Sequence, residues 1–141
     1  MPAKIRFTVI LLFILIMGVS ETMGQSKEMT PEQVVQANLD CYNRRDIDGF
    51  MSYFSPDIKM YNFADNSVTI EGLEQYRKVY KELFDLSPNL HSTIVKRITF
   101  DNKVIDHESI AGRRGSDGIF EIVLIYEVKD NKIYKITAIR K

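Results

Sequence analysis

The sequence contains very little of what builds a metal centre or a disulfide framework. Among its 141 residues there are one cysteine, Cys41, two histidines and no tryptophan. A single cysteine cannot form an internal disulfide, and His91 and His107 do not have the spacing of a metal site. We therefore expect no metal ion and no cofactor, and a fold that is stabilised by its hydrophobic core.

The sequence also has no excess of charge of either sign. Lys and Arg together number 19, and Asp and Glu together number 19, so the formal net charge is zero. The nearest approach to a basic cluster is Arg113-Arg114, and two arginines beside a glycine-rich turn are typical of solvated surface. This balance argues against a nucleic-acid partner.

No apolar run is long enough to be typical of a transmembrane helix. Residues 7–17 are apolar apart from Thr8 and follow Lys4 and Arg6, but a membrane span needs about 20 apolar residues. A short apolar run after basic residues is typical of a signal peptide. We expect residues 1–24 to be cleaved after Gly24, or alternatively after Ser20. The mature domain, residues 25–141, would then be exported, periplasmic or secreted, with no stable membrane anchor. An uncleaved anchor is the alternative.

The first half of the mature chain has the signals of three helices and a hairpin. Thr30-Pro31-Glu32-Gln33 is a helix start in which Thr30 caps and Gln33 closes a capping box. Apolar residues then recur at helical spacing, with Asn38 and Tyr42 on the apolar stripe. The predicted elements are helices at 31–43, 47–54 and 73–86 and strands at 58–63 and 68–70.

Residues 90–140 read as four strands of an antiparallel meander, with turns at 101–102, 115–118 and 130–131. Residues 119–126 are apolar on both faces, so both faces of the sheet must be covered. The helices can cover one face. We expect a second copy of the chain on the other, in a homodimer whose interface consists of Ile110, Val123, Ile125, Ile133 and Ile139.

The order of these elements and four short motifs resemble one superfamily. The motifs are YNRRD at 42–46, FSPDI at 54–58, EG at 71–72 and YEVKDNKI at 126–133. Together they are similar to the SnoaL-like branch of the nuclear transport factor 2-like superfamily, and VIDHE at 104–108 with Gly112 resembles proteins labelled steroid isomerase-like. The resemblance implies an α+β, cystatin-like fold: a cone-shaped, curved, mainly antiparallel sheet wrapped around three N-terminal helices, with a pocket inside.

The resemblance does not carry over the steroid isomerase site. That enzyme needs a carboxylate base, a tyrosine and a protonated aspartic acid. The corresponding places fall at Asn62, Asn38 and near Leu124. Because an asparagine cannot accept a proton at neutral pH, isomerisation by that mechanism is not expected.

The pattern leaves His107 as the candidate for chemistry. If Gly115 opposes Gly118, His107 faces Tyr126 inside the cone, while Asp106 and Glu108 lie on the outer face. His107 is then either a proton-transfer group with Tyr126, for which Asp40 is the candidate orienting carboxylate, or a hydrogen-bonded histidine without a catalytic role.

We predict an exported, noncatalytic small-molecule-binding domain. The alternative is a proton-transfer enzyme of the isomerase, dehydratase or hydrolase type, which would use His107 on a small apolar cyclic substrate. The candidate ligand-binding residues are Asn38, Tyr42, Asn62, Tyr80, Leu124 and Ile136.

Overall fold

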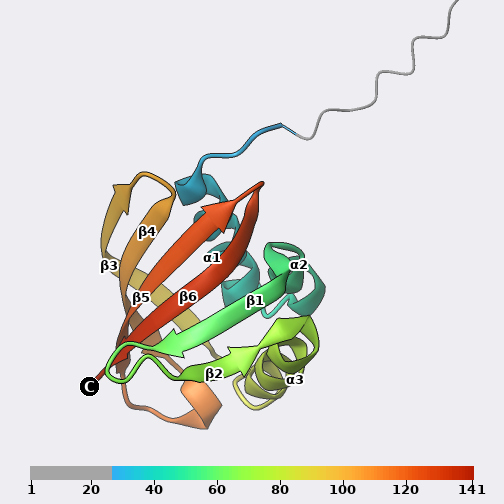
Figure 1. Ribbon diagram of the computed structural model, residues 1–141. Helices are drawn as coiled ribbons and strands as arrows, with labels where there is room; N and C mark the ends of the chain where they lie inside the picture. Colours follow the sequence, from blue (N-terminus) through green and yellow to red (C-terminus); the bar gives the residue numbers. More distant parts are fainter. Residues whose placement is uncertain (1–26) are drawn as a thin grey trace, which may run out of the picture.

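The computed structural model describes residues 27–141 (Figure 1). In this part of the chain the helices are α1 (Pro31–Arg44), α2 (Ile47–Ser52) and α3 (Gly72–Asp85), with a short 3-10 turn, η1 (Arg113–Gly115). The strands are β1 (Phe54–Asn62), β2 (Val68–Glu71), β3 (His91–Phe100), β4 (Lys103–Ala111), β5 (Phe120–Lys129) and β6 (Lys132–Arg140). The predicted signal peptide, residues 1–24, lies outside the described residues. Within them, no helix is both long and apolar enough to cross a membrane.

The six strands form one curved sheet in the order β2-β1-β6-β5-β4-β3. All neighbours are antiparallel except β1 and β6, which are parallel. The three helices lie on one side of the sheet, and no element of residues 27–141 covers its other face (Figure 1). The predicted α+β fold, with a curved and mainly antiparallel sheet around N-terminal helices, is confirmed.

Local sequence signals account for the helix ends. The side chain of Thr30 accepts a hydrogen bond from the Gln33 backbone N–H, and the Gln33 side chain accepts one from the Thr30 N–H, which completes the predicted capping box. Arg45 ends α1 in the left-handed conformation, with φ 56°. Asp46 then caps α2 by accepting a hydrogen bond from the Gly49 N–H.

Strand β1 begins at Phe54, earlier than the sequence pattern indicates. The prediction ended the second helix at residue 54 and began the strand at residue 58, but Pro56 lies within the strand. No residue of β1 between Phe54 and Lys59 is paired with β6, because the register shifts there. Proline has no backbone N–H to donate, so an unpaired stretch tolerates it.

An aromatic cluster fills the space between the helices and the inner face of the sheet. The ring of Phe50 lies 5.0 Å from that of Phe54 and 4.7 Å from that of Tyr80, and Tyr76 stacks on Tyr80 at 5.7 Å. Tyr76 is fully buried, and its hydroxyl has no hydrogen-bond partner among the described residues. The cluster lines one side of an internal cavity.

The hairpin between β4 and β5 differs from its predicted register by three residues. His107 pairs with Val123 and Glu108 pairs with Ile122, whereas the prediction paired His107 with Tyr126. An odd shift exchanges the two faces of a strand. Glu108 and Asp106 are therefore buried on the inner face, and the placement of His107 inside the cone is wrong. Ile110 is also buried on the inner face, so its assignment to the outer face is wrong.

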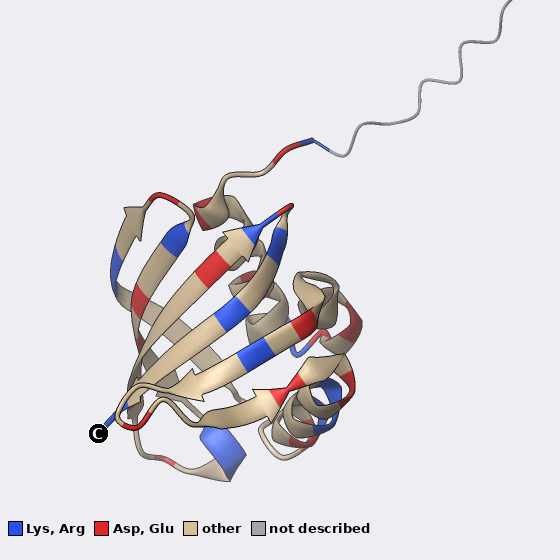
Figure 2. Ribbon diagram, viewed as in Figure 1, with Lys and Arg blue, Asp and Glu red and all other residues tan. Residues whose placement is uncertain are grey.

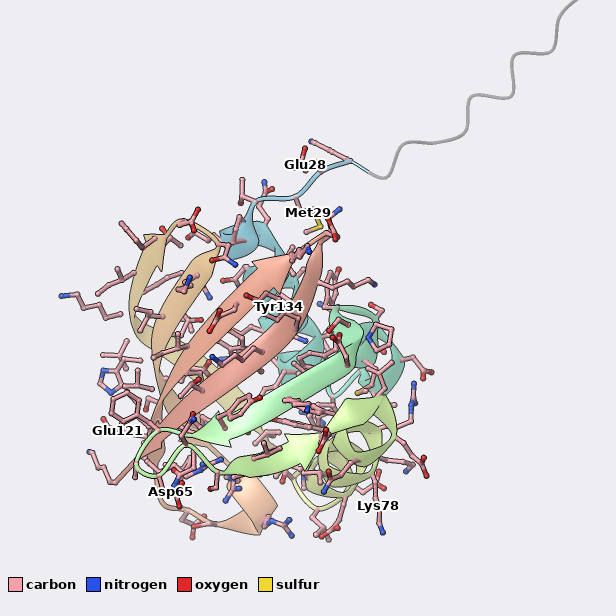
Figure 3. All side chains as sticks on the ribbon, in the orientation of Figure 1. Glu28, Met29, Asp65, Lys78, Glu121 and Tyr134 are labelled. Atoms are coloured by element: carbon pink, nitrogen blue, oxygen red, sulfur yellow. The ribbon has the colours of Figure 1, made fainter. Side chains whose placement is uncertain are left out.

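Ile133 is a second correction on the sheet. It is fully buried, although the prediction placed it on the outer face. The register of β5 and β6 shifts between Glu127 and Val128, so that Glu127 pairs with Lys135 while Val128 pairs with Ile133. The intervening Tyr134 bulges outward and donates a hydrogen bond to Glu127 (2.9 Å), on the face turned away from the helices (Figure 3).

Candidate functional site

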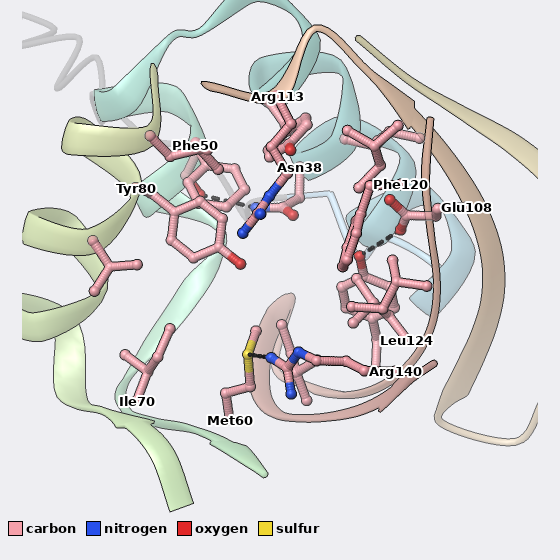
Figure 4. Close-up of a pocket in the computed structure, with 18 of the residues that line it drawn as sticks. Asn38, Phe50, Met60, Ile70, Tyr80, Glu108, Arg113, Phe120, Leu124 and Arg140 are labelled. Atoms are coloured by element: carbon pink, nitrogen blue, oxygen red, sulfur yellow. Dashed lines mark hydrogen bonds between the residues drawn. The ribbon is translucent and has the colours of Figure 1, made fainter. Parts of the chain in front are cut away.

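A cavity of about 170 Å³ lies between the helices and the inner face of the sheet (Figure 4). Strands β1, β2, β4, β5 and β6 contribute to its walls, together with all three helices and the loop after β4. Most of the wall is aliphatic or aromatic, including Phe50, Ile70, Leu83, Phe120, Leu124 and Ile136. A small number of polar groups interrupt this surface.

The structure brings most of the predicted site residues together. Among those predicted, the residues that line the cavity are Asn38, Tyr42, Tyr80, Leu124, Tyr126 and Ile136. Whether these residues bind a ligand stays a prediction.

Asn62 and His107 are not part of the cavity wall. The Asn62 side chain donates a hydrogen bond to Asp65 (2.8 Å) in the turn that follows β1, so its placement at the pocket is wrong. The His107 side chain is 38% exposed, and its Nε2 lies 3.9 Å from the Glu121 carboxylate on the outer face. A histidine in this position cannot reach a molecule inside the cone.

Glu108 is the carboxyl group of the cavity wall. It is only 3% exposed, and each of its oxygens accepts a hydrogen bond: Oε2 from the Ser92 hydroxyl (2.7 Å) and Oε1 from the Tyr126 hydroxyl (2.9 Å). Burial raises the pKa of Glu108, and the two hydroxyl donors oppose that rise. Burial, followed by the nearby Glu108 charge, raises the pKa of Tyr126, so its phenol stays protonated and donates.

Asn38 and two further tyrosines supply the other neutral polar groups. The Asn38 amide nitrogen donates to the Phe50 carbonyl across α1 and α2 (3.0 Å), which fixes the side chain at the cavity wall. Burial raises the pKa of Tyr80 to about 12, and it raises that of Tyr42 as well. Within residues 27–141 neither phenol is bonded to another group, so both hydroxyls can meet a ligand.

Three arginines also line the cavity. Arg113 and Arg114 come from η1, between β4 and β5, and Arg140 from the end of β6. Figure 4 shows the side chains of Arg113 and Arg140 reaching towards the cavity from different sides. Arg113 is half-buried and its guanidinium lies over the Phe120 ring at 4.8 Å, whereas Arg140 is exposed.

Asp106, the other buried carboxylate of β4, belongs to an ion pair outside the cavity wall. Its carboxylate is fully buried and receives two hydrogen bonds of 2.7 Å from Arg97, which also donates to Gln36 of α1. Neither Asp106 nor Arg97 lines the cavity. This ion pair joins the sheet to α1. It also explains how Asp106, one of the two carboxylates on the inner face, can be buried.

Sequence reasoning missed Glu108, Arg113, Arg114 and Arg140 as cavity residues. Strand alternation correctly puts Glu108 and His107 on opposite faces of β4, but which of them faces inward follows only from the length of the loop at residues 112–119. Arg113-Arg114 was interpreted as solvated surface; Arg114 is exposed and pairs with Glu82 at 3.2 Å, but it also borders the cavity. The described residues contain no group of three His, Cys, Asp or Glu side chains placed to hold a metal ion.

The chain belongs to the SnoaL-like domain family, whose model matches residues 35–136. No curated protein sequence matches it significantly. Its fold is shared with an uncharacterised cystatin-fold protein from Novosphingobium aromaticivorans, which is 24% identical with a TM-score of 0.72; the match covers 80% of this chain and 100% of the other.

Two further solved structures with lower identity show the same fold. A protein with a ketosteroid isomerase-like fold from Catenulispora acidiphila is 18% identical, with a TM-score of 0.62, over 78% of this chain and 85% of the other. An LEH-like epoxide hydrolase from M. tuberculosis is 16% identical, with a TM-score of 0.65, over 79% and 82%. The family match confirms the suspected SnoaL-like membership, and these structures share the fold.

Proposed function

We propose that this domain binds a small, largely apolar molecule in the cavity inside its cone. The observation that carries the proposal is the cavity itself, which is preformed and lined by apolar and aromatic side chains with few polar groups. Its volume of about 170 Å³ is close to that of an engineered protein cavity of about 150 Å³ that binds benzene. The ligand is therefore about the size of one substituted ring.

Noncatalytic binding is favoured because Glu108, the carboxyl group of the wall, is already engaged. Both oxygens of Glu108 accept hydrogen bonds from protein hydroxyls. The amide nitrogen of Asn38 is bonded to a backbone carbonyl. Binding needs none of these bonds to break, whereas proton transfer to Glu108 would need one of them to be exchanged.

A binding experiment with a blocked cavity tests this proposal. Single-ring ketones, alcohols and acids would be titrated into the protein and followed by amide chemical shifts. Leu124→Trp, which places a larger side chain in the cavity, should abolish the shifts. Thr93→Trp, on the exposed face of β3, should leave them unchanged. Equal binding to the wild type and to Leu124→Trp would contradict the proposal.

Proton transfer at Glu108 is the second candidate function. It is favoured by one observation, a buried carboxyl group with a raised pKa beside a phenol that can donate to an oxyanion. In this reaction an α-proton of a cyclic ketone moves to the Glu108 carboxylate, and Tyr126 donates to the enolate oxygen. Deuterium exchange into cyclohexanone measures it. Glu108→Gln should abolish the exchange and His107→Gln, on the outer face, should not.

We also infer that the domain is exported, from the apolar run and small residues of the first 24 positions. Sequencing the N-terminus of exported protein should give Gln25. Protein that is retained in the cell with residues 1–24 attached would contradict export.

A further inference from the structure

Arg113 and Arg140 are 27 positions apart in the sequence but line the same cavity. Arg140 pairs with Ile122 across β5 and β6, which places it on the inner face of the sheet. Arg113 follows β4 in the loop at the cavity rim. Figure 4 shows both side chains directed into the space that the Tyr80 hydroxyl also faces. Two positive charges and a phenol are thus directed at one space.

No carboxylate of the described chain neutralises either arginine. Other arginines form ion pairs, including Arg97 with Asp106 and Arg114 with Glu82. In residues 27–141, Arg113 and Arg140 have no acidic side chain at salt-bridge distance. The nearest candidate on the cavity wall, Glu108, is bonded to Ser92 and Tyr126 instead.

The contacts that these two arginines do make are weak ones. The Arg113 guanidinium lies over the face of Phe120, and Nη2 of Arg140 donates to the Met60 sulfur at 3.6 Å. A thioether is a poor acceptor, and a ring face leaves the planar N–H donors free. The guanidinium fork has the geometry that binds a carboxylate through paired hydrogen bonds.

The loop that carries Arg113 is held in place by the rest of the fold. The backbone N–H of Arg114 donates to the buried Ser87 hydroxyl at 2.8 Å. Gly112 has φ 69°, and a Cβ there would come within 2.3 Å of the Asn89 carbonyl oxygen, so the loop touches the end of the α3–β3 connection. A fixed loop reduces the entropic cost of binding a ligand.

We propose that the ligand is a small monocarboxylic acid whose carboxylate lies between Arg113 and Arg140 and whose apolar, single-ring body fills the cavity. This inference depends on the proposed binding function and specifies its ligand class. Among the described residues neither arginine has a carboxylate partner, so a ligand carboxylate would supply the missing counter-ion and could accept hydrogen bonds from both guanidinium groups.

Matched pairs of acids and neutral analogues test the proposal. 3-Phenylpropionate, 3-phenylpropanol and 3-phenylpropionamide would be titrated into the full mature chain at low salt and neutral pH. The acid should bind roughly tenfold more tightly than either neutral compound, since a hydrogen bond to a charged group contributes about 1.5 kcal/mol or more. The preference should decrease as salt is added.

The variants locate the effect. Arg113→Gln with Arg140→Gln should remove the preference for the acid, so that the acid and 3-phenylpropanol bind with similar affinity. Arg77→Gln, at an arginine of α3 that pairs with Asp48 and does not line the cavity, should retain the preference.

Each outcome separates the two proposals. Neutral compounds that bind as tightly as the acid, or a preference that survives in the double variant, would overturn the carboxylate proposal and leave the binding function standing. Absence of binding by all three compounds would overturn both.

Discussion

The hydroxyl group of Tyr126 on β5 donates a hydrogen bond of 2.9 Å to the carboxylate of Glu108 on β4. Both residues lie on the inner face of the sheet and are almost fully buried. The bond places an ionisable group against an apolar cavity, where it affects both the stability of the fold and the choice of ligand. It also exists only because Glu108, rather than His107, faces inward.

The raised pKa of Glu108 predicts a pH-dependent cost of folding. Below the ordinary pKa of 4.5 the carboxyl is protonated in both the folded and the unfolded state. As pH rises, the unfolded chain loses the proton first, so the wild-type protein loses stability between 4.5 and the raised folded value. Glu108→Gln has no proton to lose. In urea unfolding, the free energy of unfolding of Glu108→Gln should therefore increase relative to that of the wild type. The increase should be about 1.4 kcal/mol for each unit by which folding raises the pKa of Glu108.

Glu121→Gln is the control for that series, because Glu121 is on the outer face and the Lys141 ammonium lowers its pKa. It should show no such gain with rising pH. A difference between Glu108→Gln and the wild type that is constant with pH would mean that burial does not raise the pKa of Glu108.

Removing one partner of the Arg97–Asp106 ion pair should be strongly destabilising. The Asp106 carboxylate is fully buried, and Arg97 is only 14% exposed. Asp106→Asn leaves the largely buried guanidinium with only the exposed Glu32 carboxylate at 3.9 Å, so we expect the free energy of unfolding to decrease by about 3 kcal/mol. Arg97→Met in the same chain should restore part of the loss. Denaturant unfolding measures both variants, and a loss below about 1 kcal/mol for Asp106→Asn would contradict the role assigned to the pair.

Two glycines in the loop after β4 form a matched pair of test sites. Gly112 and Gly115 both have positive φ, 69° and 71°, so alanine at either position should cost about 1 kcal/mol in backbone strain. Only at Gly112 would the added Cβ collide with the Asn89 carbonyl oxygen; at Gly115 it meets nothing within 4 Å. Gly112→Ala should therefore also displace Arg113 and weaken the binding of 3-phenylpropionate. Similar affinities in titrations of the two variants would show that the close contact does not position the arginine.

The outer face of the sheet predicts a homodimer. Ile98 pairs with Ile105 and Ile105 with Ile125, so three strands present one apolar row, and Ile98 is 51% exposed. Val123 and Ile139 pair on the same face. Figure 2 shows the charged positions of this face crossing the strands in a band, with strand segments of uncharged residues beside it. We propose that a second copy covers this uncharged surface.

Val123→Asp should convert the dimer to a monomer, because it places a charge at the centre of that surface. Lys78→Asp, on the exposed side of α3, should not. Sedimentation at micromolar concentration distinguishes the two states, and a monomeric wild type would refute the dimer.

Most of the fold could be predicted because its signals are local. The capping box at Thr30, the helical stripe through Asn38 and Tyr42, and the inward alternation of Leu124 and Tyr126 each depend on a few neighbouring residues. The faces of β4 depend instead on its register with β5, which is set by the loop around Arg114 and its positive φ. Sequence pattern could not reveal that loop geometry.

The burial of two carboxylates had no local signal either. The predicted register placed Asp106 and Glu108 on the outer face, and the cost of burying an unpaired charge gave no reason to reverse that placement. Their partners are distant in sequence: Arg97 for Asp106, and Ser92 and Tyr126 for Glu108. Burial became favourable only once the tertiary structure had brought those donors together.

Intermolecular nuclear Overhauser effects from a methyl-labelled protein test the central claim most directly. With 3-phenylpropionate and with 3-phenylpropanol, the ring protons should show contacts to the inner methyl groups of Leu124, Ile122 and Ile136, which line the cavity. The outer methyl groups of Val123 and Ile125 alternate with them on β5 and should show none. Contacts only to the outer methyl groups, or to no methyl group at saturating ligand, would contradict a binding site inside the cone.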